Sequence, residues 1–308
     1  MHSHTIFAVD VSKDSLQIQT TAEAFDLCLD SQGLRKFISR LRKATPKALV
    51  VFEATGGYER PLLEALRKAN IDMRLLNPAR VRDFARSEGI RAKTDPIDAK
   101  VILRFALEKK LEPLAPISAD QQALCDLLDR RAHLTEQLAR EKNRLQKAPK
   151  LTAPSIKKMI AYVKRQIDSI EKLIREHLSA HCNLAEQVRI FTTVQGVGEL
   201  TAWTIVAFLS EIGSLRRNAL VALAGLAPFN RDSGTTSKKR RITAGRAKVR
   251  RVLYMATQTA AQWNPHIKAY VEGLLARGKP YKCAIVAAMR KLLIHLNSLL
   301  KALPPLPA

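Results

Sequence analysis

Ala48-Leu49-Val50-Val51-Phe52-Glu53 is a run of five apolar residues that ends in a carboxylate. A strand that is apolar at every position suits the middle of a sheet whose two faces are both covered. Thr5–Asp10 has the same character and also ends in an acid, so it predicts a second buried strand. Shorter strands are expected at Leu16–Thr20, Ala24–Leu29 and Met73–Leu76.

Segments with helical spacing separate these strands. Ser31 is expected to cap a helix that carries Leu34, Phe37, Ile38 and Leu41 on one face. Further helices are expected around Leu62–Leu66 and from about Ala79 and Pro96. Three early strands, followed by strands alternating with helices, predict an α/β fold with a mixed sheet flanked by helices.

The rest of the chain has helical periodicity. Pro113 and Pro116 indicate a linker, and two long segments with heptad spacing follow, which predict a helical hairpin or a dimerising coiled coil. From about Arg189 to the end, apolar helical segments are separated by glycine turns. We therefore expect three domains: an α/β domain at 1–112, a coiled-coil or hairpin domain at 113–186, and a mostly α-helical basic domain at 187–308.

The charge of the chain is strongly unbalanced. Its 52 Lys and Arg against 28 Asp and Glu give a formal net charge of +24 over 308 residues. Residues 214–308 alone carry 18 basic and 2 acidic side chains. This excess argues against an enzyme of small metabolites and indicates a polyanionic partner, of which nucleic acid is the commonest.

Cysteine spacing and the first residues bear on the cellular location. The four cysteines lie far apart and form no CxxC pair, which argues against a zinc ribbon or a disulfide scaffold and fits a reducing cytosol. The start has no signal-peptide pattern, and uncharged apolar stretches such as Leu200–Ser210 and Ala219–Asn230, of about 11–12 residues, are short for a membrane span. We expect a cytoplasmic protein without a membrane.

Four acids are candidates for a metal site. Asp10 and Glu53 end the two buried strands, and adjacent strands would bring them to one edge of the sheet. Asp95 and Asp98 begin one helix, with Asp95 as the N-cap before Pro96. Converging carboxylates repel unless a cation is present, and oxygen ligands select Mg²⁺ or Mn²⁺. This is the arrangement of an RNase H-like (RuvC-like) nuclease, although Asp95 as a simple cap and Asp10 as a turn residue remain the alternative.

Ser233 is the candidate nucleophile. It lies in Asn230-Arg231-Asp232-Ser233-Gly234, just before a run of positive charge, so its hydroxyl could meet a phosphate. A serine before glycine is otherwise only a turn. The cations expected to contact phosphate, unless they form a solvated helix face, are Lys238, Lys239, Arg240, Arg241, Arg246, Lys248, Arg250 and Arg251.

Gln195-Gly196-Val197-Gly198 separates two apolar helical segments. A turn of this kind can lay backbone N–H groups of Gly196 and Gly198 against phosphate, as a helix-hairpin-helix does. A plain turn between helices is equally consistent with the residues. His177, His181 and Cys182 are expected on a helix surface rather than at a metal, and Trp263 and Tyr254 in the core rather than as stacking platforms for bases.

Several motifs resemble one transposase family over nearly the whole chain. Phe7–Lys13, Phe52–Tyr58 and Lys93–Ala99 resemble the amino-terminal DEDD motifs of the bacterial insertion sequence one-hundred-and-ten family, whose members are called bridge-RNA-guided recombinases. Five further stretches of the chain resemble the carboxy-terminal transposase domain of this family. They are Val194–Gly198, Leu223–Pro228, Ser233-Gly234, Arg246–Met255 and Gly278-Lys279-Pro280. Ser237 stands where many relatives carry glycine, which affects the expected loop shape.

The resemblance implies a RuvC-like domain in which Asp10, Glu53, Asp95 and Asp98 bind Mg²⁺ or Mn²⁺. It implies that Ser233 forms a covalent phosphoserine link to DNA, and that a structured non-coding guide RNA pairs with donor and target DNA. It also suggests a homo-oligomer, a dimer or tetramer, with active sites composed from different subunits. The family's bacterial origin further implies a bacterial cytoplasm and association with the nucleoid when the enzyme acts. Two other interpretations remain: a metal-dependent nuclease or resolvase that uses water, and a non-catalytic nucleic-acid scaffold.

Overall fold

The computed structural model describes residues 4–45, 47–90, 95–109, 111, 118–229, 241–242 and 245–302, with backbone alone for 95–97, 229 and 241. The chain divides into two compact units, Met1–Pro116 and Ile117–Ala308. Each unit has its own buried hydrophobic residues.

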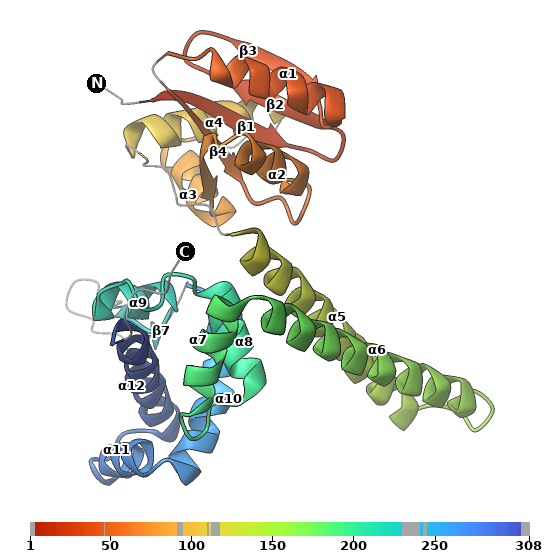
Figure 1. Ribbon diagram of the computed structural model, residues 1–308, viewed down its shortest axis with the longest axis vertical. Helices are drawn as coiled ribbons and strands as arrows, with labels where there is room; N and C mark the ends of the chain where they lie inside the picture. The colour runs from red at the N-terminus through yellow and green to blue at the C-terminus, as the bar shows by residue number, and fades with distance from the viewer. Residues whose placement is uncertain are drawn as a thin grey trace. The chain divides into compact units, whose positions relative to one another are not determined.

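The first unit is a five-stranded mixed sheet with helices on both faces (Figure 1). The strand order is β3-β2-β1-β4-β5, in which β1–β2 and β2–β3 are antiparallel whereas β1–β4 and β4–β5 are parallel. This confirms the predicted α/β architecture. The elements are β1 (Thr5–Val11), β2 (Ser15–Gln19), β3 (Ala24–Cys28), α1 (Ser31–Arg42), β4 (Ala48–Glu53), α2 (Arg60–Lys68), β5 (Asp72–Leu76), α3 (Pro78–Ser87) and α4 (Asp95–Glu108).

The central strands are apolar throughout because both of their faces are covered. In β1, Phe7 and Val9 face the side that packs on α1 and α2, and Ile6 and Ala8 face the side that packs on α3 and α4. The neighbouring strand β4 divides in the same way, since successive side chains of a strand point to opposite faces. All five apolar residues of β4 are buried.

Helix α1 begins one residue differently from the prediction. Asp30, not Ser31, is its N-cap, and the Asp30 carboxylate accepts a hydrogen bond of 2.7 Å from the backbone N–H of Gly33. Asp and Ser are about equally good N-caps, so their order in the sequence does not decide between them. The backbone of Asp30 is extended, with φ of −124° and ψ of 177°, which makes it the last residue before the helix.

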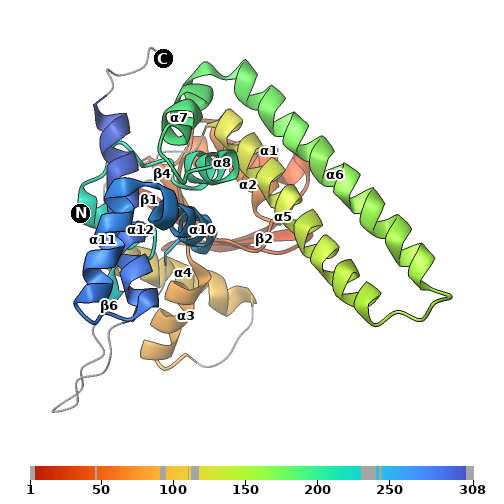
Figure 2. The same cartoon turned by 90° about the horizontal axis from the view of Figure 1, so that it is seen from below.

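The second unit begins with a long helical hairpin, α5 (Ala119–Gln146) and α6 (Ala153–Ala180), which lie side by side (Figure 2). An ion pair crosses the hairpin: the Arg131 Nη2 atom lies 2.7 Å from the Glu171 Oε1 atom. At the base, Leu124, Leu128 and Ile174 belong to the same core as the following helices. The base of the α5–α6 hairpin thus contributes to the core of the carboxy-terminal helices.

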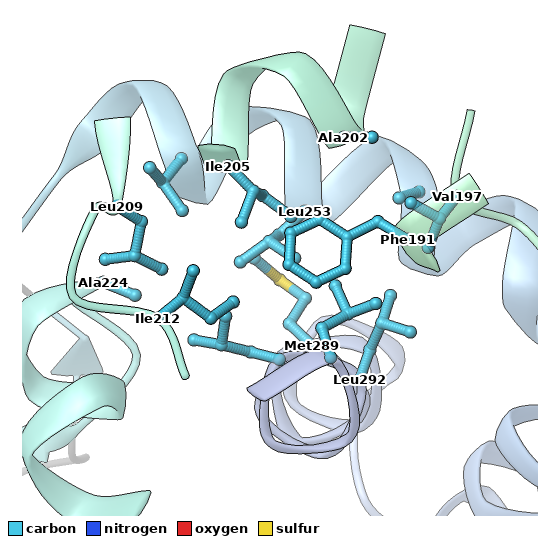
Figure 3. Close-up of a cluster of buried hydrophobic side chains, with 14 of the residues drawn as sticks. Phe191, Val197, Ala202, Ile205, Leu209, Ile212, Ala224, Leu253, Met289 and Leu292 are labelled. Carbon is cyan, nitrogen blue, oxygen red and sulfur yellow. The ribbon is translucent and has the colours of Figure 1, made fainter. Parts of the chain in front are cut away.

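The remaining elements complete the second unit. They are α7 (Cys182–Thr192), α8 (Glu199–Phe208), α9 (Arg217–Leu223), the short strands β6 (Pro228–Phe229) and β7 (Arg241–Ile242), α10 (Ala247–Trp263), α11 (Pro265–Ala276) and α12 (Tyr281–Lys301). Figure 3 shows their core, where Phe191, Ile205 and Leu253 pack against Met289 and Leu292. The helical carboxy-terminal part is therefore confirmed.

Helix α12, Tyr254 and Trp263 were expected to be buried, and the structure gives the burial of each. Among the described helices α12 alone has the length and apolar composition to cross a membrane, yet eight of its residues are buried within the unit. Tyr254 packs against the core as predicted. Trp263 does not: its side chain is 70% exposed, because it lies at the end of α10, beyond the last buried turn.

Candidate active site

Two of the predicted acids meet at one edge of the sheet. Val9 of β1 and Phe52 of β4 are partners in the parallel ladder, and Asp10 and Glu53 are the next residues of the two strands. Parallel strands place their carboxyl ends at the same edge, which is why these two side chains come together. Both residues are partly buried.

Asp98 reaches the same place from the other side. It lies in the first turn of α4, the helix that packs across β1. Asp10, Glu53 and Asp98 all line one cavity of about 570 Å³, together with Thr55, Arg82 and Arg86. Three of the four predicted acids are thus brought to one cavity. Asp95 is the first residue of α4, and its side chain lies outside the described part of the chain.

The donor set of this cavity fits a hard divalent cation, since its candidate ligands are carboxylate oxygens without cysteine or histidine. In the described part of the chain, however, no group of three acidic, histidine or cysteine side chains is close enough together to hold an ion. The cavity also receives two guanidinium groups from α3, of which Arg86 lies 3.5 Å from Asp83.

The loop after Glu53 is fixed by an acid that sequence reasoning missed. One carboxylate oxygen of Glu59 accepts hydrogen bonds from the Thr55 N–H at 3.1 Å, the Thr55 hydroxyl at 2.8 Å and the Gly57 N–H at 2.8 Å. Burial would raise the pKa of Glu59, but these hydrogen bonds outweigh it and the pKa is lowered. Glu59 therefore holds Thr55 at the cavity wall as a carboxylate.

Ser233, Lys238, Lys239 and Arg240 lie outside the described residues. The chain on either side of them is well defined: Pro228 pairs with Ile242, and Phe229 with Arg241, in an antiparallel ladder. Next to it, Gly245 packs directly on Gly225, where a Cβ on Gly245 would come within 2.2 Å of the Gly225 nitrogen. Both ends of the segment that carries Ser233 are thus held together at the second unit's core.

Two cations of the predicted phosphate-binding run form ion pairs within the protein. The Arg246 guanidinium forms a bidentate pair with Glu211 at 2.5 and 2.6 Å and also donates to the Phe208 carbonyl. Lys248 pairs with Asp129 of α5 and lies over the ring of Phe208. Arg250 is partly buried, and Arg251 is exposed.

The two glycines of the predicted turn differ in their surroundings. Gly196 has φ of +96°, and a Cβ there would lie 2.6 Å from the backbone of Ala260 in α10. Gly198 is the N-cap of α8 with φ of −84°, and a Cβ there would meet no atom within 4 Å. Packing inside the protein therefore explains Gly196, whereas Gly198 faces open space.

His177 of α6 and His181, the residue that follows this helix, both contact Asp120 of α5. The His177 Nε2 atom lies 2.8 Å from the Asp120 carbonyl oxygen, and His181 Nε2 lies 3.1 Å from the Asp120 carboxylate. They form no metal cluster with other described residues. These contacts give both histidines a structural role, since they join α5 to the carboxyl end of α6.

Comparison with known proteins gives the class of the chain. A family model described as a transposase, of the DEDD type, matches residues 2–154, so the class is an enzyme that recombines DNA. The model of the "Transposase IS116/IS110/IS902 family" matches residues 188–272. The chain belongs to the IS110 family of transposases. The DEDD type of its first domain implies dependence on a divalent metal.

Two curated relatives match over nearly the full length. They are the "Pilin gene-inverting protein" of Moraxella lacunata and that of Moraxella bovis. Each is 25% identical over 303 residues, a span that covers 94% of this chain and 94% of the relative.

Proposed function

We propose that this transposase cleaves and rejoins DNA strands with Asp10, Glu53, Asp95 and Asp98 as ligands of Mg²⁺ or Mn²⁺ and with Ser233 as the nucleophile. The observation that carries the proposal is the cavity at the carboxyl ends of β1 and β4, which three of the four acids line. The strand order, three antiparallel strands followed by two parallel ones, supports an RNase H-like domain.

The proposed reaction is a phosphoryl transfer to serine. The Ser233 oxygen forms a bond to the scissile phosphorus, the bond from phosphorus to one deoxyribose oxygen breaks, and that oxygen leaves as a hydroxyl after taking a proton. A bound divalent cation would supply charge stabilisation of the phosphate oxygens and favour loss of the serine proton. The four carboxylates would hold this cation, and Glu59 keeps the Thr55 side of the cavity in place. The freed hydroxyl of another strand then attacks the phosphorus of the phosphoserine and loses its proton. The bond from phosphorus to the Ser233 oxygen breaks, the serine hydroxyl regains a proton, and the DNA strands are joined.

A guide RNA and a homo-oligomer complete the proposal. The concentration of 18 basic against 2 acidic residues in 214–308 supports binding of more than one nucleic-acid segment. The two relatives are named for the inversion of a gene. Inversion requires that DNA strands are cut and joined to new partners, so the name supports cleavage followed by rejoining. Sequencing of the nucleic acid that copurifies with the protein should recover one discrete structured RNA, whereas bulk cellular RNA would contradict guidance.

Replacement of the proposed nucleophile tests the covalent step. With labelled substrate DNA, Ser233→Ala should form no DNA-linked protein on a denaturing gel, because alanine has no oxygen to bond to phosphorus. Ser237→Ala, a hydroxyl removed from the same segment, is the matched control and should form the adduct. An adduct with Ser233→Ala, or cleavage by the wild type without any adduct, would contradict the serine mechanism and favour a resolvase that uses water.

Replacement of one cavity acid tests the metal site. Asp98→Asn should lower Mg²⁺-dependent cleavage by at least about 100-fold, since it removes a charge that the cation requires. Glu64→Gln, an exposed acid of α2 away from the cavity, serves as control and should cleave normally. Undiminished cleavage by Asp98→Asn removes Asp98 from the site, and activity that never depends on metal would favour the scaffold interpretation.

A further inference from the structure

An aromatic ring and a thioether are exposed on two helices of the second unit that pack against each other. Met255 of α10 is 62% exposed, and Tyr281, the first residue of α12, is 49% exposed. The Tyr281 hydroxyl donates a hydrogen bond to the Gln258 side chain at 2.5 Å. Gln258 lies three residues after Met255 on the same face of α10, so this bond holds the ring beside the thioether.

The surroundings of this pair are cationic. Arg251 lies one helical turn before Met255, and Lys279 and Lys282 flank Tyr281. All three cations are exposed, and none of them forms an ion pair with another described residue. Glu272 is the single acid between residues 245 and 302. A polyanion is therefore the complementary partner, and the exposed ring and thioether favour one that also offers flat bases.

We propose that Arg251, Met255, Gln258, Lys279, Tyr281 and Lys282 form a binding surface for single-stranded DNA. An unpaired base can stack on the Tyr281 ring and the Met255 thioether while the neighbouring phosphates contact the cations. A duplex keeps its bases stacked on each other and has no free face for the ring. The surface suits a recombinase because DNA strands lose their pairing partner while they are exchanged.

Binding of the full-length protein to a labelled oligothymidylate of about 20 nucleotides tests the surface. Tyr281→Ala should weaken binding roughly 10-fold, because one base loses its stacking partner. Tyr281→Phe keeps the ring and should bind within about 2-fold of wild type. Tyr162→Ala removes a tyrosine of similar exposure, 52%, from α6 and should leave binding unchanged. If Phe binds as weakly as Ala, the hydroxyl contact and not the ring is responsible, and the inference is wrong.

Two further measurements decide between partners. In a strand that carries 2-aminopurine, the fluorescence of this base should be quenched by wild type and by Tyr281→Phe but not by Tyr281→Ala. Quenching reports stacking of the base on the ring, which a merely structural role of the ring would not produce. The assignment would be overturned if Tyr281→Ala lost as much affinity for duplex DNA as for single-stranded DNA. It would also be overturned if the protein bound oligouridylate more than about 10-fold more tightly than oligothymidylate. None of these results depends on Ser233, so failure here is distinct from failure of the proposed chemistry.

Discussion

At the scale of the residue, one turn contains two glycines with opposite reasons for being glycine. Gly196 has a positive φ and lies against the Ala260 backbone, so any side chain there collides with α10. Gly198 has an ordinary φ and open space where a side chain would be. An open glycine at a helix start permits a phosphate backbone to come close to the N–H groups of α8.

Paired substitutions separate the two roles. Gly196→Ala should lower the free energy of unfolding by about 1–3 kcal/mol, through strain and overlap with Ala260. Gly198→Ser should leave it unchanged, since serine is a good N-cap, but should weaken binding to duplex DNA several-fold. Chemical denaturation and DNA titration measure the two effects. Equal stability of Gly196→Ala and wild type would contradict the packing, and unaltered DNA binding by Gly198→Ser would exclude the phosphate contact.

The sequence predicts single residues well where the signal is local. Asp10 and Glu53 stand at the ends of apolar strands, so their meeting follows from strand pairing alone. The role of Glu59 was missed because three donors converge on it only after the loop has formed. Trp263 was misplaced because an aromatic residue at the end of a helix has the same local pattern whether or not a neighbouring element covers it.

At the scale of the element, the start of α10 is tied to the loop before α9. Arg246 donates to both oxygens of Glu211, and its backbone N–H donates to the Leu223 carbonyl. Burial would raise the pKa of Glu211, but the hydrogen bonds and charge of Arg246 outweigh it and hold the pKa below its ordinary value of 4.5. The ionised carboxylate therefore stabilises the fold above that value, and the contribution fades as the pH falls through the lowered pKa.

The ion pair gives a pH-dependent prediction. Glu211→Gln should lower the free energy of unfolding by about 2 kcal/mol at pH 7, and the difference from wild type should shrink as the pH falls below about 4.5. Glu186→Gln breaks an exposed pair with Arg189 on one helix and should change little. Thermal unfolding followed from pH 7 to pH 3 provides the measurement. A difference that is constant over this range would refute the electrostatic account.

Elements themselves were easier to predict than their partners. Helices and strands follow from apolar periodicity within a few residues, and each expected strand of the first unit is present. Arg246 and Lys248 were predicted to contact phosphate, yet their carboxylate partners lie 35 and 119 positions away in the sequence. No local pattern relates residues so far apart, so a basic run alone cannot separate cations that bind nucleic acid from those that hold the fold.

At the scale of the whole molecule, the two units differ in the residues that the proposed reaction would use. The first unit carries the carboxylates, and the second carries most of the charge excess and the segment with Ser233. Composition alone predicts this division, because charge can be counted without knowing the fold. It did not predict that the hairpin base belongs to the second core, since heptad spacing is the same in a free coiled coil and in a helix pair anchored by its neighbours.

The anchoring of α5 and α6 is one-sided. Buried residues extend from the base of the hairpin to Leu134 and Val163 near its middle, whereas Leu151 in the connecting turn is 93% exposed and the neighbouring positions are unburied. The far end can therefore fray or be nicked by a protease while the helices at the root keep their packing. It is also the position where a tag, a fluorophore or a foreign domain could be inserted with the least disturbance to the enzyme.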